Sequence, residues 1–275
     1  MNQVEVSPLI ATGSDAQAEP HVEPFRFKIS IVMPALNEEK NVSAAVMDAV
    51  SSFERIGCSG EIIIVNDGST DKTEEVVRGL MKKYPFIRVV VHDKPKGIGA
   101  AFWEGVAHAE GELVTLLPGD GENDSYEILR YMPLMDHVDI IVPFIYNKQV
   151  RSWQRRLISK VYKAVINISF RILLNYMNGT VMYRRSVLQT LTLKNNGFFY
   201  QAELLIKALR RGYLYAEVPY AIKRRADGKS KALSIKSLVR VVSGYLRAMI
   251  SVNWPSGEKV TIARDSVTAM RQREF

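Results

Sequence analysis

Three carboxylates stand close together in residues 118–124, which read PGDGEND. Asp120, Glu122 and Asp124 follow an apolar stretch, and glycines flank Asp120 on both sides. Carboxylates at this spacing repel one another unless a cation lies between them. Mg²⁺ and Mn²⁺ prefer oxygen ligands, and Mg²⁺ commonly bridges one or two carboxylates to substrate phosphates. We therefore predict a divalent-metal site in this acidic loop (residues 118–124), with a solvated polar turn as the alternative.

Two further polar loops each follow an apolar stretch. The first loop, residues 34–39 (PALNEE), comes after KISIVM, and the second loop, residues 66–71 (NDGSTD), comes after EIIIV. In the second loop, Gly68 permits a tight turn and Asp67 can accept hydrogen bonds from the edge of a base. Asp71 lies in the first turn of an expected helix, where a carboxylate is favoured for structural reasons alone. Both loops are candidate nucleotide contacts, with plain turn roles as the alternative.

The lysine–glycine loop, residues 94–99 (KPKGIG), precedes another expected helix. Backbone amides at a helix start favour phosphate, and lysine adds positive charge. The segment does not match the P-loop pattern GxxxxGK[ST], nor a GxGxxG fingerprint after the first strand. It therefore predicts phosphate contact without naming a nucleotide-binding class.

The hydrophobic pattern predicts the elements that position these loops. Continuous apolar runs predict strands at residues 28–33, 61–65, 87–92, 113–117 and 139–143. Apolar residues at helical spacing predict helices at 41–56, 69–84, 99–109 and 126–135, the second of them capped by Ser69 or Thr70. This alternation is typical of an α/β protein with a mainly parallel sheet. Right-handed crossovers then bring the loops after the strands to the carboxyl edge, where such sheets bind ligands.

The second half of the chain is expected to be more helical. Helices are predicted at residues 152–176, 199–211 and 235–250, and short strands at 180–184 and 215–219. Residues 1–26 show no periodicity and predict a mobile, disordered tail. The polar stretch after Trp254 predicts a loosely ordered C-terminal tail.

Composition excludes several classes of protein. The chain has 275 residues and a net charge of +8, and residues 148–176 carry many lysines and arginines but no acid. Such asymmetry indicates an anionic partner: phosphates, nucleic acid or an anionic membrane face. Helix-turn-helix, zinc and aromatic RNA-binding patterns are all absent from the sequence, so nucleic acid is not expected. The single cysteine, Cys58, excludes an internal disulfide and is expected to be a small buried or loop residue rather than a catalytic thiol.

Membrane contact, if it occurs, is expected at the surface. The sequence contains no apolar run of roughly 18 residues that would span a bilayer, and no secretory signal pattern. The helices expected at 152–176 and 235–250 are amphipathic and basic, a pattern that suits a membrane interface. Sheet cover or a dimer contact is the alternative, so a homo-oligomer stays open. We expect a cytoplasmic protein that is peripheral to the cytoplasmic membrane face.

Several segments, taken in order, carry a family resemblance. They are IVMPALNEEKNV (31–42), EIIIVNDGSTDKT (61–73), KGIGAAFWEGVAHAEGELVTLLPGDGE (96–122), NGTVMYRRSVL (178–188), GFFYQAELLIKALRRGY (197–213) and RRADGKSK (224–231). Together they resemble the family 2 glycosyltransferases of the GT-A fold, and most of all the polyprenyl-phosphate (dolichyl-phosphate) mannosyl- and glucosyltransferases. The resemblance implies a Rossmann-like GT-A catalytic domain over 27–232, after a tail at 1–26 and before an amphipathic helix and tail at 233–275.

The resemblance also implies which residues contact the nucleotide-sugar. The residues implied at the base and ribose are Pro34, Leu36, Glu38 and Asp67, with Asp67 bonded to the base. Lys96 and Gly97 would lie near the same nucleotide.

The remaining implied roles concern metal, phosphate and acceptor. Asp120 and Glu122 would hold Mg²⁺ or Mn²⁺, which makes Asp120 catalytic, and Glu203 would be the acidic residue near the acceptor. The residues implied at phosphate or acceptor groups are Arg224, Arg225, Lys229, Ser230 and Lys231. One departure is visible: relatives usually read DxDxQ at the metal loop, whereas here Pro118 replaces the first aspartate and Glu122 the glutamine.

The implied reaction is metal-dependent transfer of a sugar from a nucleotide-sugar to a polyprenyl phosphate at the membrane surface, with inversion at the anomeric carbon. A lipid phosphate is already ionised at neutral pH, whereas a hydroxyl acceptor needs a base, for which Glu203 is the candidate. Two alternatives stay open: transfer to a saccharide or other hydroxyl, and a non-catalytic relative that binds nucleotide-sugars. A nucleotidyltransferase is disfavoured, because the first strand is not followed by a GxGTR-like loop.

Overall fold

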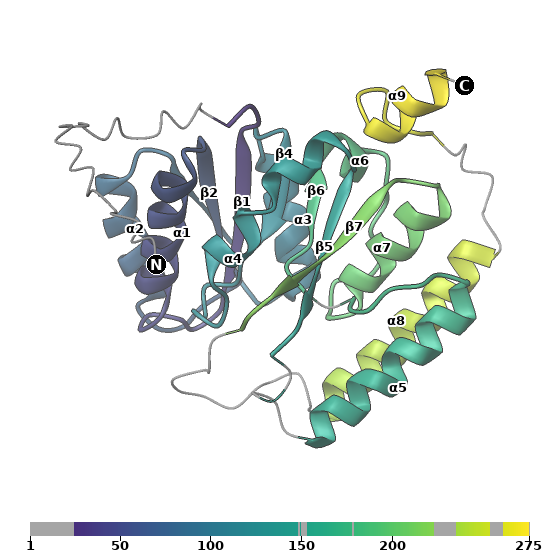
Figure 1. Cartoon of the computed structure of the whole chain (residues 1–275). Helices are drawn as coiled ribbons and strands as arrows, with labels where there is room; N and C mark the ends of the chain where they lie inside the picture. Colours follow the sequence, from purple (N-terminus) through teal and green to yellow (C-terminus); the bar gives the residue numbers. More distant parts are fainter. Residues whose placement is uncertain are drawn as a thin grey trace, which may run out of the picture.

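A computed structural model describes residues 25–147, 149, 153–177, 179–222, 235–253 and 261–274. Within these residues, seven strands form one mixed sheet in the order β3-β2-β1-β4-β6-β5-β7, with helices on both faces (Figure 1). Of the strands described, only β6 runs antiparallel to its neighbours. The predicted α/β class with a mainly parallel sheet is therefore confirmed.

The first half of the chain alternates strands and helices, as predicted. Its elements are β1 (Ile29–Ala35), α1 (Val42–Ile56), β2 (Gly60–Asn66), α2 (Thr73–Lys83), β3 (Ile87–Val91), α3 (Ile98–His108) and β4 (Leu113–Leu116). β1 pairs in parallel with β2 and with β4, and β2 pairs in parallel with β3. The carboxyl ends of these strands therefore lie at one edge of the sheet, the carboxyl edge.

The second half completes the sheet and adds the long helices. Its elements are α4 (Ser125–Leu129), the 3₁₀ helix η1 (Met132–Asp136), β5 (Ile140–Ile145), α5 (Trp153–Phe170), β6 (Met182–Arg184), α6 (Arg185–Gln189), α7 (Tyr200–Arg210), β7 (Tyr215–Tyr220), α8 (Ile235–Asn253) and α9 (Val267–Glu274). β6 lies between β4 and β5, and β7 pairs in parallel with β5.

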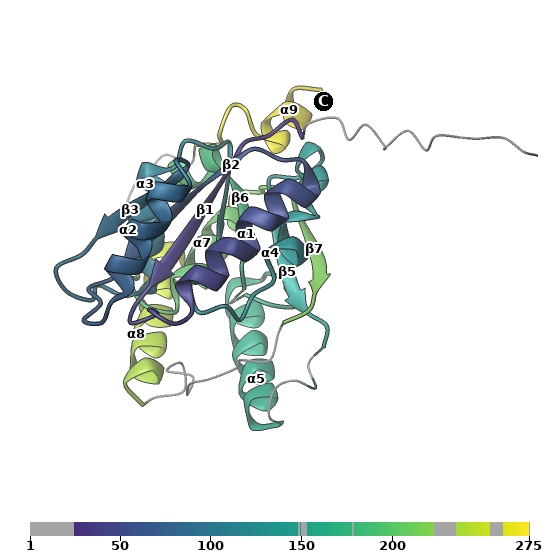
Figure 2. The same cartoon turned by 90° about the vertical axis from the view of Figure 1, so that its left-hand side faces the viewer.

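Alternate residues of the central strand β1 face opposite sides of the sheet, as the pleat requires. Val32 packs in one buried cluster with side chains of α3 and α7, whereas Ile31 and Met33 pack in another with side chains of α1 and α4. Figure 2 shows α1 and α4 on one side of the sheet and α3 on the other. Burial on both faces explains why this strand reads as a continuous apolar run.

Two predicted helices differ in their limits. The prediction that Ser69 or Thr70 caps the second helix is wrong: α2 begins at Thr73, and its N-cap side chain makes no capping hydrogen bond. Residues 126–135 form α4 and then η1 rather than one helix. Pro133 accounts for the break, because a proline has no N–H to donate to the carbonyl four residues earlier and its ring clashes with that carbonyl.

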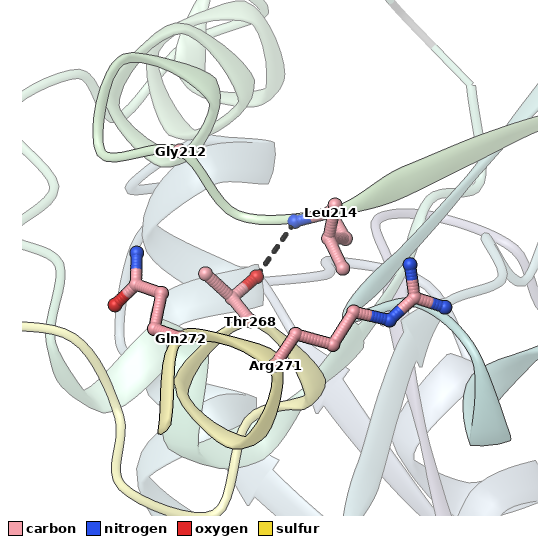
Figure 3. Close-up of a pocket in the computed structure, with 5 residues that line it drawn as sticks. All are labelled: Gly212, Leu214, Thr268, Arg271 and Gln272. Atoms are coloured by element: carbon pink, nitrogen blue, oxygen red, sulfur yellow. Dashed lines mark hydrogen bonds between the residues drawn. The ribbon is translucent and has the colours of Figure 1, made fainter. Parts of the chain in front are cut away.

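The prediction of a loose C-terminal tail is wrong for residues 261–274. The amides of Val267 and Thr268, at the start of α9, donate to the buried carboxylate of Asp139 at 2.7 and 3.0 Å. The Thr268 hydroxyl also accepts a hydrogen bond from the Leu214 amide at 2.9 Å (Figure 3). The tail is therefore ordered by polar partners that lie far away in the sequence. The other predicted tail, at residues 1–26, falls mostly outside the described residues.

A shallow pocket of about 350 Å³ lies between α9 and the turn before β7 (Figure 3). Its lining residues are Gly212, Leu214, Thr268, Arg271 and Gln272. Leu214 directly precedes β7, so the pocket lies at the amino ends of the parallel strands, opposite the carboxyl edge.

The helices α5 and α8 project past the carboxyl edge in both views (Figures 1 and 2). They meet where Phe170 packs edge-on against Tyr245, whose hydroxyl lies 2.8 Å from that of Ser169. In the described part of the chain, no helix is both long and apolar enough to cross a membrane.

Two buried ionisable groups lie near the start of β2, at the end opposite the carboxyl edge. Cys58 is buried, as one of the two expected placements had it, and burial raises the pKa of its thiol to about 11. Glu61 is 4% exposed and accepts hydrogen bonds from the Ser30 hydroxyl at 2.6 Å and the Glu110 amide at 2.7 Å, and it pairs with Arg88. Burial raises the pKa of Glu61, but these hydrogen bonds lower it by more, so its net pKa lies below the ordinary value.

We expect Glu61→Gln to lower the free energy of unfolding at pH 7 by about 1–3 kcal/mol. A depressed folded pKa stabilises the protein above the unfolded pKa of about 4.3, and this contribution disappears as the pH falls through the folded pKa. The difference in Tm between wild type and variant should therefore be largest near neutral pH and shrink below about pH 4. A difference that stays constant across a pH series of thermal melts would contradict the assigned role of the ionised carboxylate.

Candidate active site

The loops at the carboxyl edge are joined by hydrogen bonds that continue the strand pairing. The Gly119 amide donates to the Pro34 carbonyl at 3.0 Å, and the Asp67 amide donates to the Ala35 carbonyl at 2.9 Å. The acidic loop and the second loop therefore flank the first loop on either side. The predicted metal and nucleotide residues are brought together at this edge, as the strand order requires.

Asn37 joins the first loop to the second. Its backbone is left-handed, with φ of 55°, and its amide donates to the Ser69 hydroxyl at 3.0 Å. Its side-chain oxygen accepts a hydrogen bond from the Thr70 amide at 2.8 Å. Asparagine tolerates this backbone conformation better than most residues, which suits it to the position. Ser69 and Thr70 are thus engaged with the first loop and are unavailable as helix caps.

Asp71 gives the same two loops a second connection. Its carboxylate accepts hydrogen bonds from the Thr73 amide at 3.0 Å and the Glu39 amide at 3.2 Å. Burial raises the pKa of Asp71, but the hydrogen bonds from Thr73 and then Glu39 lower it by more. Of the two roles considered for this residue, the structural one accounts for its contacts.

Asp67 is buried, and its carboxylate points into the protein. One oxygen accepts the Lys96 amide at 2.8 Å and lies 2.7 Å from His92 Nδ1, and the other oxygen accepts the Gly97 amide at 2.9 Å. Asp67 therefore holds the lysine–glycine loop against the second loop. Its contact with a base stays a prediction.

The start of α3 contacts the loop before α7. The amides of Gly99 and Ala100 donate to the Asn196 carbonyl at 2.8 and 3.4 Å. With the amides of Lys96 and Gly97 bonded to Asp67, these helix-start amides are engaged by protein, contrary to the expectation that they bind phosphate. The Lys96 side chain is exposed, and its contact with a nucleotide stays a prediction.

The acidic loop divides its carboxylates between two roles. Asp124 caps α4, because its side chain accepts the Glu127 amide at 3.3 Å. Asp120 and Glu122 lie within the loop itself, where Asp120 accepts the Glu122 amide at 3.1 Å and both residues are partly exposed. The described residues contain no group of three or more His, Cys, Asp or Glu that could hold a metal. Two oxygen-donor carboxylates still suit Mg²⁺ or Mn²⁺ when substrate phosphates complete the coordination.

Glu203 is 1% exposed and bound on both oxygens. It accepts the amides of Lys194 and Asn195 at 3.1 and 3.0 Å, and it pairs with Lys207 at 2.6 Å. The carboxylate is thus directed into the loop before α7 (residues 193–199), which it holds against the helix.

The predicted phosphate and acceptor residues at 224–231 lie outside the described residues. Ile222, just before them, forms an antiparallel bridge with Asn123 of the acidic loop. The Ile222 amide also donates to the Asn147 side chain at 3.2 Å. The chain therefore enters this basic segment from beside Asp120 and Glu122.

Two residues of this edge have no role in the sequence predictions. His92 follows β3 and supports Asp67, and the Asn196 carbonyl binds the start of α3. The signal for His92 was its place at the end of a predicted strand, where the other candidate residues also lie. Asn196 acts through its backbone, which no side-chain pattern reveals.

Comparison with known proteins agrees with this arrangement. A family model described as glycosyl transferase family 2 matches residues 30–192. The dolichol-phosphate mannosyltransferase of Pyrococcus furiosus is 27% identical over 251 residues, which are 88% of this chain and 68% of that protein. A dolichyl-phosphate beta-glucosyltransferase of Trichomonas vaginalis is 38% identical over 115 residues, which are 39% of this chain and only 36% of that protein.

Solved structures show the same fold. Glucosyl-3-phosphoglycerate synthase from Mycobacterium tuberculosis, in complex with Mg²⁺ and uridine diphosphate, has a TM-score of 0.62 and 22% identity, covering 82% of this chain and 80% of that one. The same synthase in complex with Mn²⁺, UDP-glucose and phosphoglyceric acid gives the same TM-score. The expected GT-A-like arrangement of sheet and helices is thereby confirmed.

Gly97 offers a test of the packing between loops. Its φ is 104°, and a Cβ at this position would lie 2.6 Å from the Asn196 carbonyl oxygen. We expect Gly97→Ala to lower the free energy of unfolding by about 1–3 kcal/mol, because strain and steric overlap both oppose it. Gly197→Ala is the matched control, since a Cβ there meets nothing within 4 Å. Equal unfolding curves for the two variants would show that the contact is unimportant.

Proposed function

Because the chain belongs to glycosyl transferase family 2, we propose that it transfers a sugar from a nucleotide-sugar to a polyprenyl phosphate, with Mg²⁺ or Mn²⁺. The observation that carries the proposal is the hydrogen bond between Gly119 and Pro34, which sets the acidic loop beside the first loop. The names of the curated relatives support the choice of a dolichyl-type phosphate acceptor.

Asp120 and Glu122 would hold the metal ion together with the donor diphosphate. The ion would supply positive charge where negative charge develops on the leaving diphosphate, which is a large contribution to catalysis in such reactions. Pro34, Leu36, Glu38 and Asp67 would border the nucleoside, with the Lys96 side chain nearby. The first loop carries most of these groups, and its bonds to the second loop keep them in place.

Arg224, Arg225, Lys229, Ser230 and Lys231 would bind phosphate groups of donor or acceptor. The position of Ile222 supports this, since the bridge to Asn123 starts the basic segment at the acidic loop. Arginine and lysine close to a diphosphate and a lipid phosphate would neutralise both during transfer.

The burial and hydrogen bonds of Glu203 favour a phosphate acceptor over a hydroxyl acceptor. A hydroxyl must lose its proton to a base within hydrogen-bond reach, whereas a lipid phosphate is already ionised. Glu203 is buried and accepts hydrogen bonds from Lys194, Asn195 and Lys207. We propose that Glu203 positions the loop before α7, rather than serving as the base.

A polyprenyl-phosphate acceptor lies in a membrane, which would account for the exposed apolar side chains on α5 and α8. Those on α5 are Trp153, Leu157, Ile158, Val161, Val165 and Ile168, and those on α8 are Val242, Leu246 and Ile250, each 43–79% exposed. Neither helix contains an aspartate or glutamate, and both carry lysines and arginines. An apolar face with basic flanks suits the boundary of an anionic membrane. We propose that these helices hold the enzyme at the membrane surface, peripheral to the cytoplasmic face.

Replacing Asp120 tests the metal site. We expect Asp120→Asn to lower kcat by about a hundredfold or more, because one metal-binding charge is lost at the developing negative charge. Asp124→Asn is the matched control: asparagine caps helices as well as aspartate, so activity should stay near wild type. The assay offers a panel of nucleotide-sugars with Mg²⁺ or Mn²⁺ and a short polyprenyl phosphate. Near-normal transfer by Asp120→Asn would remove the metal assignment.

Liposome co-sedimentation tests the membrane face. Leu157→Glu should weaken binding to anionic vesicles about tenfold, since a buried leucine contributes roughly 1.5–3 kcal/mol and tenfold corresponds to about 1.4 kcal/mol. Met270→Glu, at an exposed residue of α9, carries the same charge change at the opposite edge and should bind like wild type. Failure of the wild-type protein to sediment at low salt would refute the membrane proposal.

A further inference from the structure

We propose that His92 is a positioning residue for donor binding, which fixes Asp67 and through it the lysine–glycine loop. The proposal rests on the proposed function, because it takes this loop to border the donor nucleotide. The His92 side chain is enclosed by protein, and it would act on the donor site through Asp67.

The His92 side chain is 2% exposed, and its Nδ1 lies 2.7 Å from an oxygen of Asp67, whose side chain is 6% exposed. Since a carboxylate only accepts hydrogen bonds, Nδ1 carries the hydrogen and donates a hydrogen bond to Asp67. Nε2 is buried and, among the residues described, finds no hydrogen-bond partner. A buried nitrogen without a partner costs free energy that a leucine at this position would avoid. The bond to Asp67 is therefore the contribution that histidine makes here.

Asp67 passes this constraint to the lysine–glycine loop. The oxygen that binds His92 also accepts the Lys96 amide at 2.8 Å, and the second oxygen accepts the Gly97 amide at 2.9 Å. With His92 in place, the Asp67 carboxylate cannot rotate without losing its hydrogen bond to the His92 ring. The loop also lies close to the second loop, because a Cβ on Gly68 would come within 2.6 Å of the Lys94 backbone.

The end of the lysine–glycine loop that leads into α3 is held by contacts that do not involve His92. The Asn196 carbonyl accepts the Gly99 amide at 2.8 Å, and Glu203 binds the amides of Lys194 and Asn195. Loss of His92 would thus loosen the donor side and leave the Glu203 contacts intact. We therefore expect an effect on donor affinity and KM, with little effect on kcat.

Substitutions at His92 separate the hydrogen bond from the volume of the side chain. His92→Asn keeps a donor nitrogen bonded to Cγ, as in Nδ1, whereas His92→Gln moves the nitrogen one bond further and His92→Leu removes it. His137→Leu, at an exposed histidine, is the control. Binding of nucleoside diphosphates with Mg²⁺ is measured by calorimetry, and KM and kcat are measured with the active nucleotide-sugar.

We expect the Leu and Gln variants to bind nucleotide about tenfold more weakly, with KM raised to match, because a charge-assisted hydrogen bond is lost. The Asn and His137→Leu variants should stay within about threefold of wild type. Wild-type affinity in His92→Leu, or equal weakness in His92→Asn, would overturn the proposal. If His92→Leu does not fold, the Asn and Gln pair decides, and equal binding by those two would overturn it.

A second readout needs no nucleotide. Hydrogen exchange of the Lys96 and Gly97 amides should be about tenfold faster in the Leu and Gln variants than in wild type, and unchanged in the Asn variant. If the wild-type protein binds none of the nucleotides, the proposed function fails, and exchange alone then decides the role of His92. Unchanged exchange in every variant would refute the positioning role.

Discussion

The pairing of β1 with β2 and β4 is the constraint on which the rest of the structure depends. Because hydrogen bonds continue past the strand ends, to Pro34 on one side and Ala35 on the other, the loops that follow cannot shift independently. A slip of one residue in β1 would turn Ile31 and Met33 to the wrong face and move both flanking loops. The same pairing that builds the core therefore sets the acidic loop beside the nucleotide loops.

Buried carboxylates provide the next level of order. Asp67 accepts backbone amides from the lysine–glycine loop, and Glu203 accepts them from the loop directly before its own helix. Such hydrogen bonds offset the cost of burying charge. The start of α3 and the loop before α7 are connected to each other by the hydrogen bonds to the Asn196 carbonyl. Gly244 of α8 packs tightly against this loop, since a Cβ there would come within 2.7 Å of Phe199. A helix of the proposed membrane face therefore contacts the same loop that contacts the start of α3.

The departure at Pro118 leaves the framework of the acidic loop intact. Proline has no amide to donate, but the bond to the first loop comes from Gly119, the next residue. Asp124 caps α4 and fixes the far end of the loop. The substitution thus removes one expected carboxylate without displacing Asp120 and Glu122 from the edge of the sheet. The proposed metal site would be completed by phosphate oxygens instead.

The sequence by itself determined the order and type of the elements in the first half, because apolar runs such as residues 61–65 and helical spacing such as residues 41–56 are local signals. It also determined that Asp67, Asp120 and Glu122 share one edge, since parallel strands with right-handed crossovers leave no other arrangement. Only the tertiary structure decided what those side chains contact. His92 beside Asp67, the Asn196 carbonyl at α3, and Asp139 at the start of α9 are contacts across 25 to 128 residues of chain. Such contacts depend on how the layers pack, and no periodicity in the sequence records them.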